Sequence, residues 1–262
     1  MAAVSLAYKE MGRGEPLLII HGLFGSGRNW ATLAKRFAET HRVFLLDMRN
    51  HGQSPWSDDM TYAAMAGDIL AFVNQLQLPK VSIVGHSMGG KAAMSFVLNQ
   101  PERVNKLVAV DIAPVSYNVK LGDYITAMKQ LDLSGTLSRS QMQTALDAVT
   151  GSSGISQFLL SSLQREGRAY RWRMNLDILD ITLNSEISGF PHHDAVWIGP
   201  ALFLSGETSA YIRDKHLPEI SRLFPNAQIL PVANAGHWLH SVQPDQTFTA
   251  IIQFLAQENF NG

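Results

Sequence analysis

Short apolar runs recur along the chain, separated by turn residues or polar residues. They lie at residues 17–22, 43–47, 81–85, 106–111, 201–205 and 228–233. A run of this length that is apolar throughout is typical of a strand buried on both faces of a sheet. We therefore expect six buried strands.

Segments with apolar residues at helical spacing lie between the early apolar runs. They cover residues 30–40, 62–78 and 88–99. Strands and helices that alternate in this way indicate an α/β fold with a mainly parallel sheet covered by helices on both faces. A last helix over Asp245–Glu258 is expected to close the chain.

The alternation breaks between about Ser116 and Ala195, where four helix-like stretches follow one another without a clear strand. The strand pattern resumes at residue 201. We interpret this interruption as a helical cap inserted into a single core. The predicted division is a core of residues 1–115 and 196–262 and a cap of residues 116–195.

Composition and charge restrict the classes of partner. Of the 262 residues, 46% are hydrophobic and 16% are charged, which is enough apolar surface for a large core. The net charge of -1 gives no basic field for nucleic-acid phosphates, so no nucleic-acid partner is expected. The first twenty residues lack the pattern of a secretory signal, and no apolar run approaches about 18 residues. These features predict a cytoplasmic protein without a membrane span.

The chain contains no cysteine, which excludes disulfides, thiol nucleophiles and cysteine zinc sites. Only His, Asp and Glu remain as metal ligands, and the group His192, His193 and Asp194 is the first place to look for them. We expect neither a metal nor a cofactor. The sequence does not determine the oligomeric state.

The segment Gly85-His86-Ser87-Met88-Gly89 follows one apolar run and opens a helical segment. A Gly-x-Ser-x-Gly sequence in this setting is typical of a nucleophile elbow, where strained backbone raises the serine above the sheet. The two glycines then let the strand and the helix approach closely. A glycine-rich helix start with a capping serine is the simpler alternative. The strand-turn-helix setting favours Ser87 as a nucleophile.

A serine hydroxyl is a poor nucleophile unless a histidine within hydrogen-bond distance removes its proton. The chain has nine histidines. His237 follows the last apolar run and precedes the closing helix, so its loop should return to the carboxyl edge of the sheet. His240 is expected in a helix or at the surface, and His86 is expected to point away from the nucleophile. His237 is therefore the predicted general base.

A carboxylate must orient the histidine and stabilise its charged form. Asp111 ends the run at 106–111, which is expected to lie beside the strand of the nucleophile. A carboxylate there would reach the histidine, although strand-end aspartates also cap loops. Glu207, which follows the run at 201–205, is the alternative acid.

The segment His21-Gly22-Leu23-Phe24-Gly25 ends the first apolar run and should lie opposite the elbow. The backbone amides of Leu23 and Met88 are the predicted donors of an oxyanion hole. A simple glycine turn after a strand is the alternative. Phe24 flanks this loop and is a predicted substrate-binding residue.

Five sequence blocks occur in a characteristic order: HGLFGS at 21–26, DMRNHGQS at 47–54, GHSMGGK at 85–91, DIAPVSY at 111–117 and AGHW at 235–238. With these blocks the chain resembles the α/β-hydrolases of the YbfF-type esterase group. The resemblance implies an α/β-hydrolase fold and cofactor-free hydrolysis of carboxylic esters, with acyl thioesters as a further substrate class. It also implies Asp111 as the acid, whereas many other α/β-hydrolases carry it where this chain has Ser209.

The predicted cap contains two clusters with candidate binding roles. An apolar set is expected to line an acyl pocket over Ser87, although such residues also suit a cap core: Met128, Met142, Phe158, Leu159, Leu160 and Met174. A basic set surrounds Tyr170 and Trp172 and suits the phosphates of coenzyme A: Arg165, Arg168, Arg171 and Arg173. A solvated helix end, or pairing with Glu166 and Asp177, is the alternative interpretation of the arginines.

The predicted activity is therefore that of a serine hydrolase acting on a small acyl ester or thioester through an acyl-serine intermediate. Two other functions fit parts of the same pattern. A carbon-carbon bond hydrolase or lyase uses the same fold and triad, but it needs polar anchors for a dianionic substrate. A non-catalytic binding module would be expected to have lost a member of the triad.

Overall fold

The computed structural model describes residues 3–118 and 121–257, and seven of its strands form one sheet. The order across the sheet is β1-β3-β2-β4-β5-β8-β9; β1 is antiparallel to β3 and every other neighbouring pair is parallel. The strands are β1 (Tyr8–Met11), β2 (Glu15–Ile20), β3 (His41–Leu46), β4 (Val81–His86), β5 (Val104–Val110), β8 (Ala201–Gly206) and β9 (Ala227–Val232).

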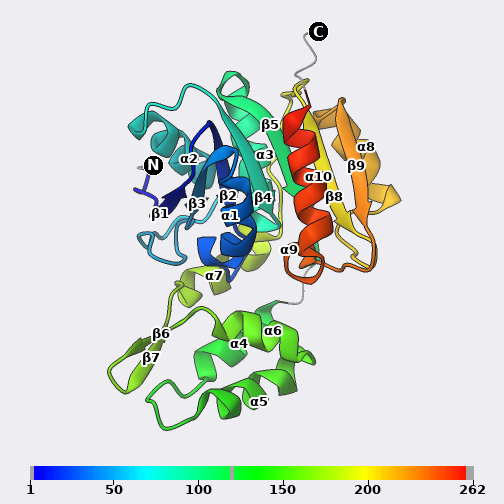
Figure 1. Ribbon diagram of the computed structural model, residues 1–262. Coiled ribbons are helices and arrows are strands. Elements are labelled where there is room, and N and C mark those ends of the chain that lie inside the picture. The colour runs from blue at the N-terminus through cyan, green and yellow to red at the C-terminus, as the bar shows by residue number, and fades with distance from the viewer. Residues whose placement is uncertain (1–2, 119–120, 258–262) are drawn as a thin grey trace.

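Helices cover both faces of this sheet (Figure 1). Apolar residues of α1 and α10 pack on one face, and those of α2, α3 and α8 pack on the other. The helices of this part are α1 (Ala31–Phe37), α2 (Tyr62–Gln75), α3 (Met88–Asn99), α8 (Leu217–Leu223), α9 (Leu239–Val242) and α10 (Pro244–Ala256), with short 3-10 turns at Gly27–Trp30, Pro101–Arg103 and Asp214–His216. The predicted α/β class with a mainly parallel sheet is confirmed.

The six predicted strands are all present, with ends that differ from the prediction by at most two residues. Every residue of β4 and β8 is buried, because helices cover both of their faces. Strand β1 was not predicted. It is a short edge strand with the sequence YKEM and mostly exposed residues, so it lacks the apolar run that marks the interior strands.

Strand β9 forms the opposite edge of the sheet, and no described strand pairs with its outer side. Ile229 and Leu230 are exposed there. The amide of Glu207 donates to the carbonyl of Val232, which therefore faces β8. Because backbone groups alternate in direction along a parallel strand, Pro231 directs its nitrogen to the open side.

The segment between β5 and β8 forms a separate group of elements beyond one end of the sheet (Figure 1). The prediction that it contains no strand is wrong, because β6 and β7 form an antiparallel hairpin around Gly167, whose φ is 62°. Each strand has only four residues, too few to give a clear alternating pattern. The elements are α4 (Gly122–Gln130), α5 (Arg139–Thr150), α6 (Ser153–Leu160), β6 (Leu163–Glu166), β7 (Ala169–Trp172), α7 (Leu176–Thr182) and the π-helix Leu183–Ile187.

The division into a core of residues 1–115 and 196–262 and a cap of residues 116–195 stays a prediction. Its outer ends at residues 1 and 262, and the predicted end of the last helix at residue 258, lie outside the described residues. Within residues 3–118 and 121–257, no helix combines the length and the apolar character that crossing a membrane requires.

Candidate active site

Ser87 occupies a sharp turn between the end of β4 and the start of α3. Its backbone angles are φ 52° and ψ -119°, which side chains rarely adopt. A Cβ atom on Gly85 would lie 2.4 Å from the carbonyl oxygen of Gly89, and one on Gly89 would lie 2.4 Å from that of His21. The turn therefore requires glycine on both sides of the serine, as the sequence motif indicates.

His237 lies between Ser87 and Asp111. Its Nε2 is 3.0 Å from Ser87 Oγ, and its Nδ1 is 2.7 Å from Asp111 Oδ2. This pattern suits the tautomer in which Nδ1–H donates to the carboxylate and Nε2 accepts from the serine hydroxyl. The structure thus brings together the three side chains singled out in the sequence, from the ends of β4 and β5 and from the loop after β9.

The carboxylate of Asp111 is fully buried and has two donors besides His237. The amide of Gly206 donates to Oδ1 at 2.9 Å, and the hydroxyl of Ser209 donates to Oδ2 at 2.5 Å. The contact of Ser209 with the acid was missed in the sequence, where the residue is notable only as a missing aspartate. The alternative acid, Glu207, accepts from the amide of Asn234 at 2.8 Å and so holds the loop that precedes His237.

Two further histidines lie near His237: His86 packs against its ring, and His240 packs against His86. The Nε2–H of His86 donates to the carbonyl of His237 at 2.8 Å, and its ring lines the same pocket as Ser87, which corrects the expectation that it points away. His240 lies in α9, buried and stacked on Trp30 with ring centroids 4.5 Å apart. Burial lowers the pKa of His86 well below its usual range and the pKa of His240 to about 3, so both rings are neutral near pH 7.

The loop after β2 faces the elbow and has a strained residue of its own, Phe24, with a φ of 64°. The amide of Phe24 donates to Nε2 of His51 at 3.3 Å, while Nδ1–H of His51 donates to the carbonyl of Arg49 at 3.0 Å. Burial lowers the pKa of His51 to about 3, so its ring stays neutral and Nε2 can accept. The amides of Leu23 and Met88 have no acceptor among the described residues and remain available to a ligand.

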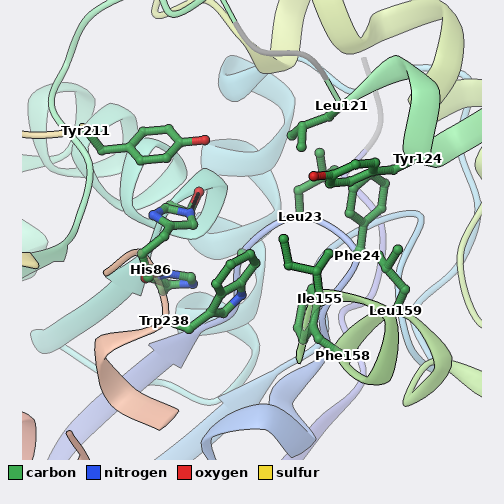
Figure 2. Close-up of a pocket in the computed structure, with 13 residues that line it drawn as sticks. Leu23, Phe24, His86, Leu121, Tyr124, Ile155, Phe158, Leu159, Tyr211 and Trp238 are labelled. Atoms are coloured by element: carbon green, nitrogen blue, oxygen red, sulfur yellow. Dashed lines mark hydrogen bonds between the residues drawn. The ribbon is translucent and has the colours of Figure 1, made fainter. Parts of the chain in front are cut away.

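Ser87 is among the residues that line a cavity of about 250 Å³. Figure 2 shows Tyr211, His86 and Trp238 on one side, and the other side combines two residues of the loop after β2 with five from the segment between β5 and β8: Leu23, Phe24, Leu121, Tyr124, Ile155, Phe158 and Leu159. None of the described residues that line it is Arg, Lys, Asp or Glu, so the cavity suits an apolar group. The lining residues are Gly22, Leu23, Phe24, His86, Ser87, Leu121, Tyr124, Ile155, Phe158, Leu159, Tyr211, His237 and Trp238.

Only two of the six cap residues expected at the pocket, Phe158 and Leu159, line this cavity. The other four are buried in the hydrophobic cluster that continues from the sheet into the cap: Met128, Met142, Leu160 and Met174. Phe24, the predicted substrate-binding residue, also lines the cavity. Leu121, Tyr124 and Ile155 were missed, because their spacing in the sequence does not show which face of a helix meets the pocket.

The arginine cluster lies on the β6–β7 hairpin and its edge, not at a helix end. Arg171 forms an ion pair with Glu166, whereas Asp177 pairs with Lys129 at 2.8 Å. None of the four arginines is among the residues that line the cavity. Within residues 3–118 and 121–257, no group of three or more His, Asp and Glu side chains is arranged to hold a metal ion.

Comparisons with known proteins agree with this architecture. Residues 15–131 match the family model of the α/β hydrolase fold. The mouse sn-1-specific diacylglycerol lipase ABHD11 is 43% identical over 92% of this chain and 80% of its own length. Esterase YbfF of Escherichia coli is 37% identical over 92% of each chain. A solved structure of a marine microorganism esterase superposes with a TM-score of 0.92 and 39% identity over 96% of this chain and 100% of its own. The chain thus belongs to the α/β-hydrolase fold family and is of the YbfF type.

Proposed function

We propose that this protein hydrolyses carboxylic esters through an acyl-serine intermediate. Ser87 is the nucleophile, His237 the general base and Asp111 the acid that orients it. The observation that carries the proposal is the chain of hydrogen bonds from Asp111 through His237 to Ser87 at the mouth of an apolar cavity. The esterases and the diacylglycerol lipase among its relatives support the same chemistry.

In the first half of the reaction, Ser87 Oγ attacks the ester carbonyl as its proton passes to His237 Nε2. Asp111 stabilises the imidazolium that forms. The amides of Leu23 and Met88 donate to the oxygen of the tetrahedral intermediate. His237 then returns the proton to the departing alcohol. In the second half, His237 removes a proton from a water molecule as its oxygen attacks the acyl carbonyl. The bond from the carbonyl carbon to Ser87 Oγ then breaks, Oγ takes the proton from His237, and the acid product leaves.

The acyl group of the substrate would occupy the cavity between the core and the proposed cap of residues 116–195. Tyr124 of α4 and Ile155, Phe158 and Leu159 of α6 supply most of the cap side of this cavity. Contacts of this kind favour long apolar acyl chains, because each buried methylene group contributes about 0.8 kcal/mol. The substrate class is therefore an ester of an apolar carboxylic acid.

An acyl thioester presents the same acyl group to Ser87, so thioester hydrolysis is the second activity of the proposal. The hairpin arginines do not line the cavity, so they do not contribute to the acyl-binding part of this proposal. A panel of nitrophenyl esters and acyl-CoA thioesters with matched acyl chains measures both activities. If the protein hydrolyses the esters and none of the thioesters, thioester hydrolysis is excluded and ester hydrolysis remains supported.

The two competing functions have less support. A carbon-carbon bond hydrolase with a dianionic substrate would need cationic anchors, and no described Arg or Lys lines the cavity of about 250 Å³. Lys91 lines a smaller cavity beside Ser87, but its ammonium group already donates to the carbonyls of Ser188 and Gly189. A binding module would have no need for a buried carboxylate, a histidine and a strained serine aligned at hydrogen-bond distances.

The Ser87→Ala variant tests the proposal directly. We expect its kcat for a nitrophenyl ester to fall by about 10⁴ to 10⁶, because members of a triad act as one unit. A fluorophosphonate probe should label the wild type and not the variant. Ser241→Ala, which changes an exposed serine in α9, is the matched control and should behave as the wild type. Retention of more than a few per cent of activity by Ser87→Ala would exclude Ser87 as the nucleophile.

A further inference from the structure

The loop that carries the Leu23 amide is held from two sides. On the side of the core, the ring of His51 accepts from the amide of Phe24. On the side of the cap, the hydroxyl of Ser162 donates to the carbonyl oxygen of Phe24 at 2.6 Å. Ser162 lies 138 residues away in sequence, is only 8% exposed and follows the end of α6.

This second contact holds a backbone conformation that is unfavourable by itself. Phe24 has a φ of 64°, and such a residue persists only when its surroundings fix it. Ser162 is the described partner of its buried carbonyl. Without that donor, the carbonyl would lose its partner, and the strained loop, still held through the contact of the Phe24 amide with His51, could relax. The Leu23 amide is part of the same loop and would shift with it.

Ser162 itself is fixed to the part of the core that holds His51. The amide of Arg173 donates to the carbonyl of Ser162 at 3.0 Å, and the amide of Gly52 donates to the carbonyl of Arg173 at 2.7 Å. Met174 forms an antiparallel bridge with His51. Both supports of Phe24 are therefore connected through one short stretch of paired backbone.

The same part of the cap also forms the wall of the acyl cavity. Ile155, Phe158 and Leu159 of α6 line the cavity, and α6 ends at Leu160, two residues before Ser162. An acyl chain that contacts α6 thus contacts the element that supports the oxyanion loop.

We propose that Ser162 is a positioning residue for the oxyanion hole, acting through the carbonyl of Phe24. The cap then contributes to the rate of the reaction as well as to substrate selection. This inference rests on the proposed function, because it assigns the Leu23 amide to the oxyanion hole.

The test compares Ser162→Ala with Ser161→Ala, a matched change at the adjacent exposed serine, whose hydroxyl donates to the carbonyl of Phe158 in α6. Loss of a whole oxyanion donor costs about 10² to 10³ in rate, and a displaced donor costs less. We expect Ser162→Ala to lower kcat about tenfold for both nitrophenyl acetate and nitrophenyl octanoate, with KM changed less than about twofold. Ser161→Ala should match the wild type.

Equal loss for short and long esters is the diagnostic result, because every ester forms the same oxyanion. A kcat equal to that of Ser161→Ala would overturn the inference. A loss that appears only in KM, or that grows with acyl length, would also overturn it and assign Ser162 to the cavity wall. If thermal melting shows that Ser162→Ala does not fold, Ser162→Cys takes its place. A thiol is a weak donor of similar size, so a kcat at least about threefold below the wild type is expected, and an unchanged kcat overturns the inference.

Different results would contradict the role of Ser162 and the proposed function. An inactive wild type that the fluorophosphonate probe does not label would contradict the proposed function. An active wild type that depends on Ser87, together with a fully active Ser162→Ala, would contradict only the role of Ser162.

Discussion

The loops at the sheet edge and the proposed cap of residues 116–195 both line the cavity beside Ser87, but they do so by different means. Six described non-glycine residues have a positive φ, and none of them lies in the cap. Five of the six belong to the loops that form the site at the sheet edge: Phe24, Asn50, Ser87, Asp111 and Asn234. The cap contributes short regular elements whose apolar side chains face the cavity.

This difference in backbone strain separates the residues expected to control the rate of the reaction from those expected to control the preference among substrates. At the sheet edge, buried contacts hold strained backbone, at a cost of order 1–3 kcal/mol for each such residue. In the proposed mechanism that geometry fixes the reacting atoms, so changes there should reduce the rate for every substrate. In the cap, packing sets the shape of the cavity, so most changes should alter the preference among substrates. Ser162 is the exception that links the two regions.

The largest effect is expected for Asp111→Asn at the sheet edge. Its kcat should fall by about 10³ to 10⁴, because an amide cannot stabilise the imidazolium of His237 and favours the wrong tautomer. Glu207→Gln is the matched control. Its carboxylate bonds to a backbone amide and not to His237, so kcat should change less than about threefold.

Ester hydrolysis by both variants should be measured together with their melting temperatures. The order of the two effects is decisive. A larger loss of kcat in Glu207→Gln than in Asp111→Asn would move the acid to the loop after β8.

An effect of intermediate size is expected for the buried His240, which should make the folded protein less stable at acid pH. Burial lowers its pKa in the folded state to about 3, whereas the unfolded chain titrates near 6.5. As the pH falls below about 6.5, the unfolded state takes up a proton that the folded state cannot. The free energy of unfolding should therefore fall by about 2 kcal/mol at pH 5 relative to pH 7.5 on account of this residue.

His240→Phe keeps an aromatic ring to stack on Trp30 and removes the titrating group. Urea unfolding at pH 7.5 and pH 5 should show about 2 kcal/mol less acid destabilisation in this variant than in the wild type. His192→Gln, at an exposed position, serves as the control and should retain the full wild-type pH dependence. Equal pH dependence of His240→Phe and the wild type would show that His240 is not a source of acid destabilisation.

The smallest effect is expected in the cap. Phe158→Ala should lower kcat/KM for nitrophenyl octanoate about tenfold and leave nitrophenyl acetate almost unchanged, because only the longer chain reaches α6. Ile181→Ala removes an apolar side chain from α7 that is 71% exposed and outside the cavity. It should leave both substrates unaffected. An equal loss of kcat/KM for both esters in Phe158→Ala would contradict a role in acyl-chain preference and would indicate a role in positioning the reacting atoms.

The sequence predicts the strands and the loops at the sheet edge well, because each of these features has a local cause. The glycines around Ser87 are needed within one turn, and the interior strands need apolar residues on both faces. Asp111 could be selected over Glu207 because it ends the strand beside β4. The contact between Ser209 and Asp111 joins residues 98 positions apart, and no local pattern marks such a contact.

The cap was predicted less well, because its contacts are decided by packing between elements. Met128 and Met142 have the same apolar character as Phe158 and Leu159, yet they pack in the cap core and do not line the cavity. The hairpin that carries Arg171 is too short for its alternation to be recognised. The hydrogen bond from the Ser162 hydroxyl to Phe24 joins residues 138 positions apart, so no local pattern in the sequence marks it.

Pro231 on β9 has a consequence for how the molecule behaves at high concentration. An open sheet edge with exposed Ile229 and Leu230 can recruit a strand from another molecule and so begin aggregation. Proline lacks an amide hydrogen, and here the missing donor lies on the open side, where an added strand would need it. Pro231 thus leaves the apolar edge exposed but removes one of the hydrogen bonds that a strand from a second molecule would need to pair with β9.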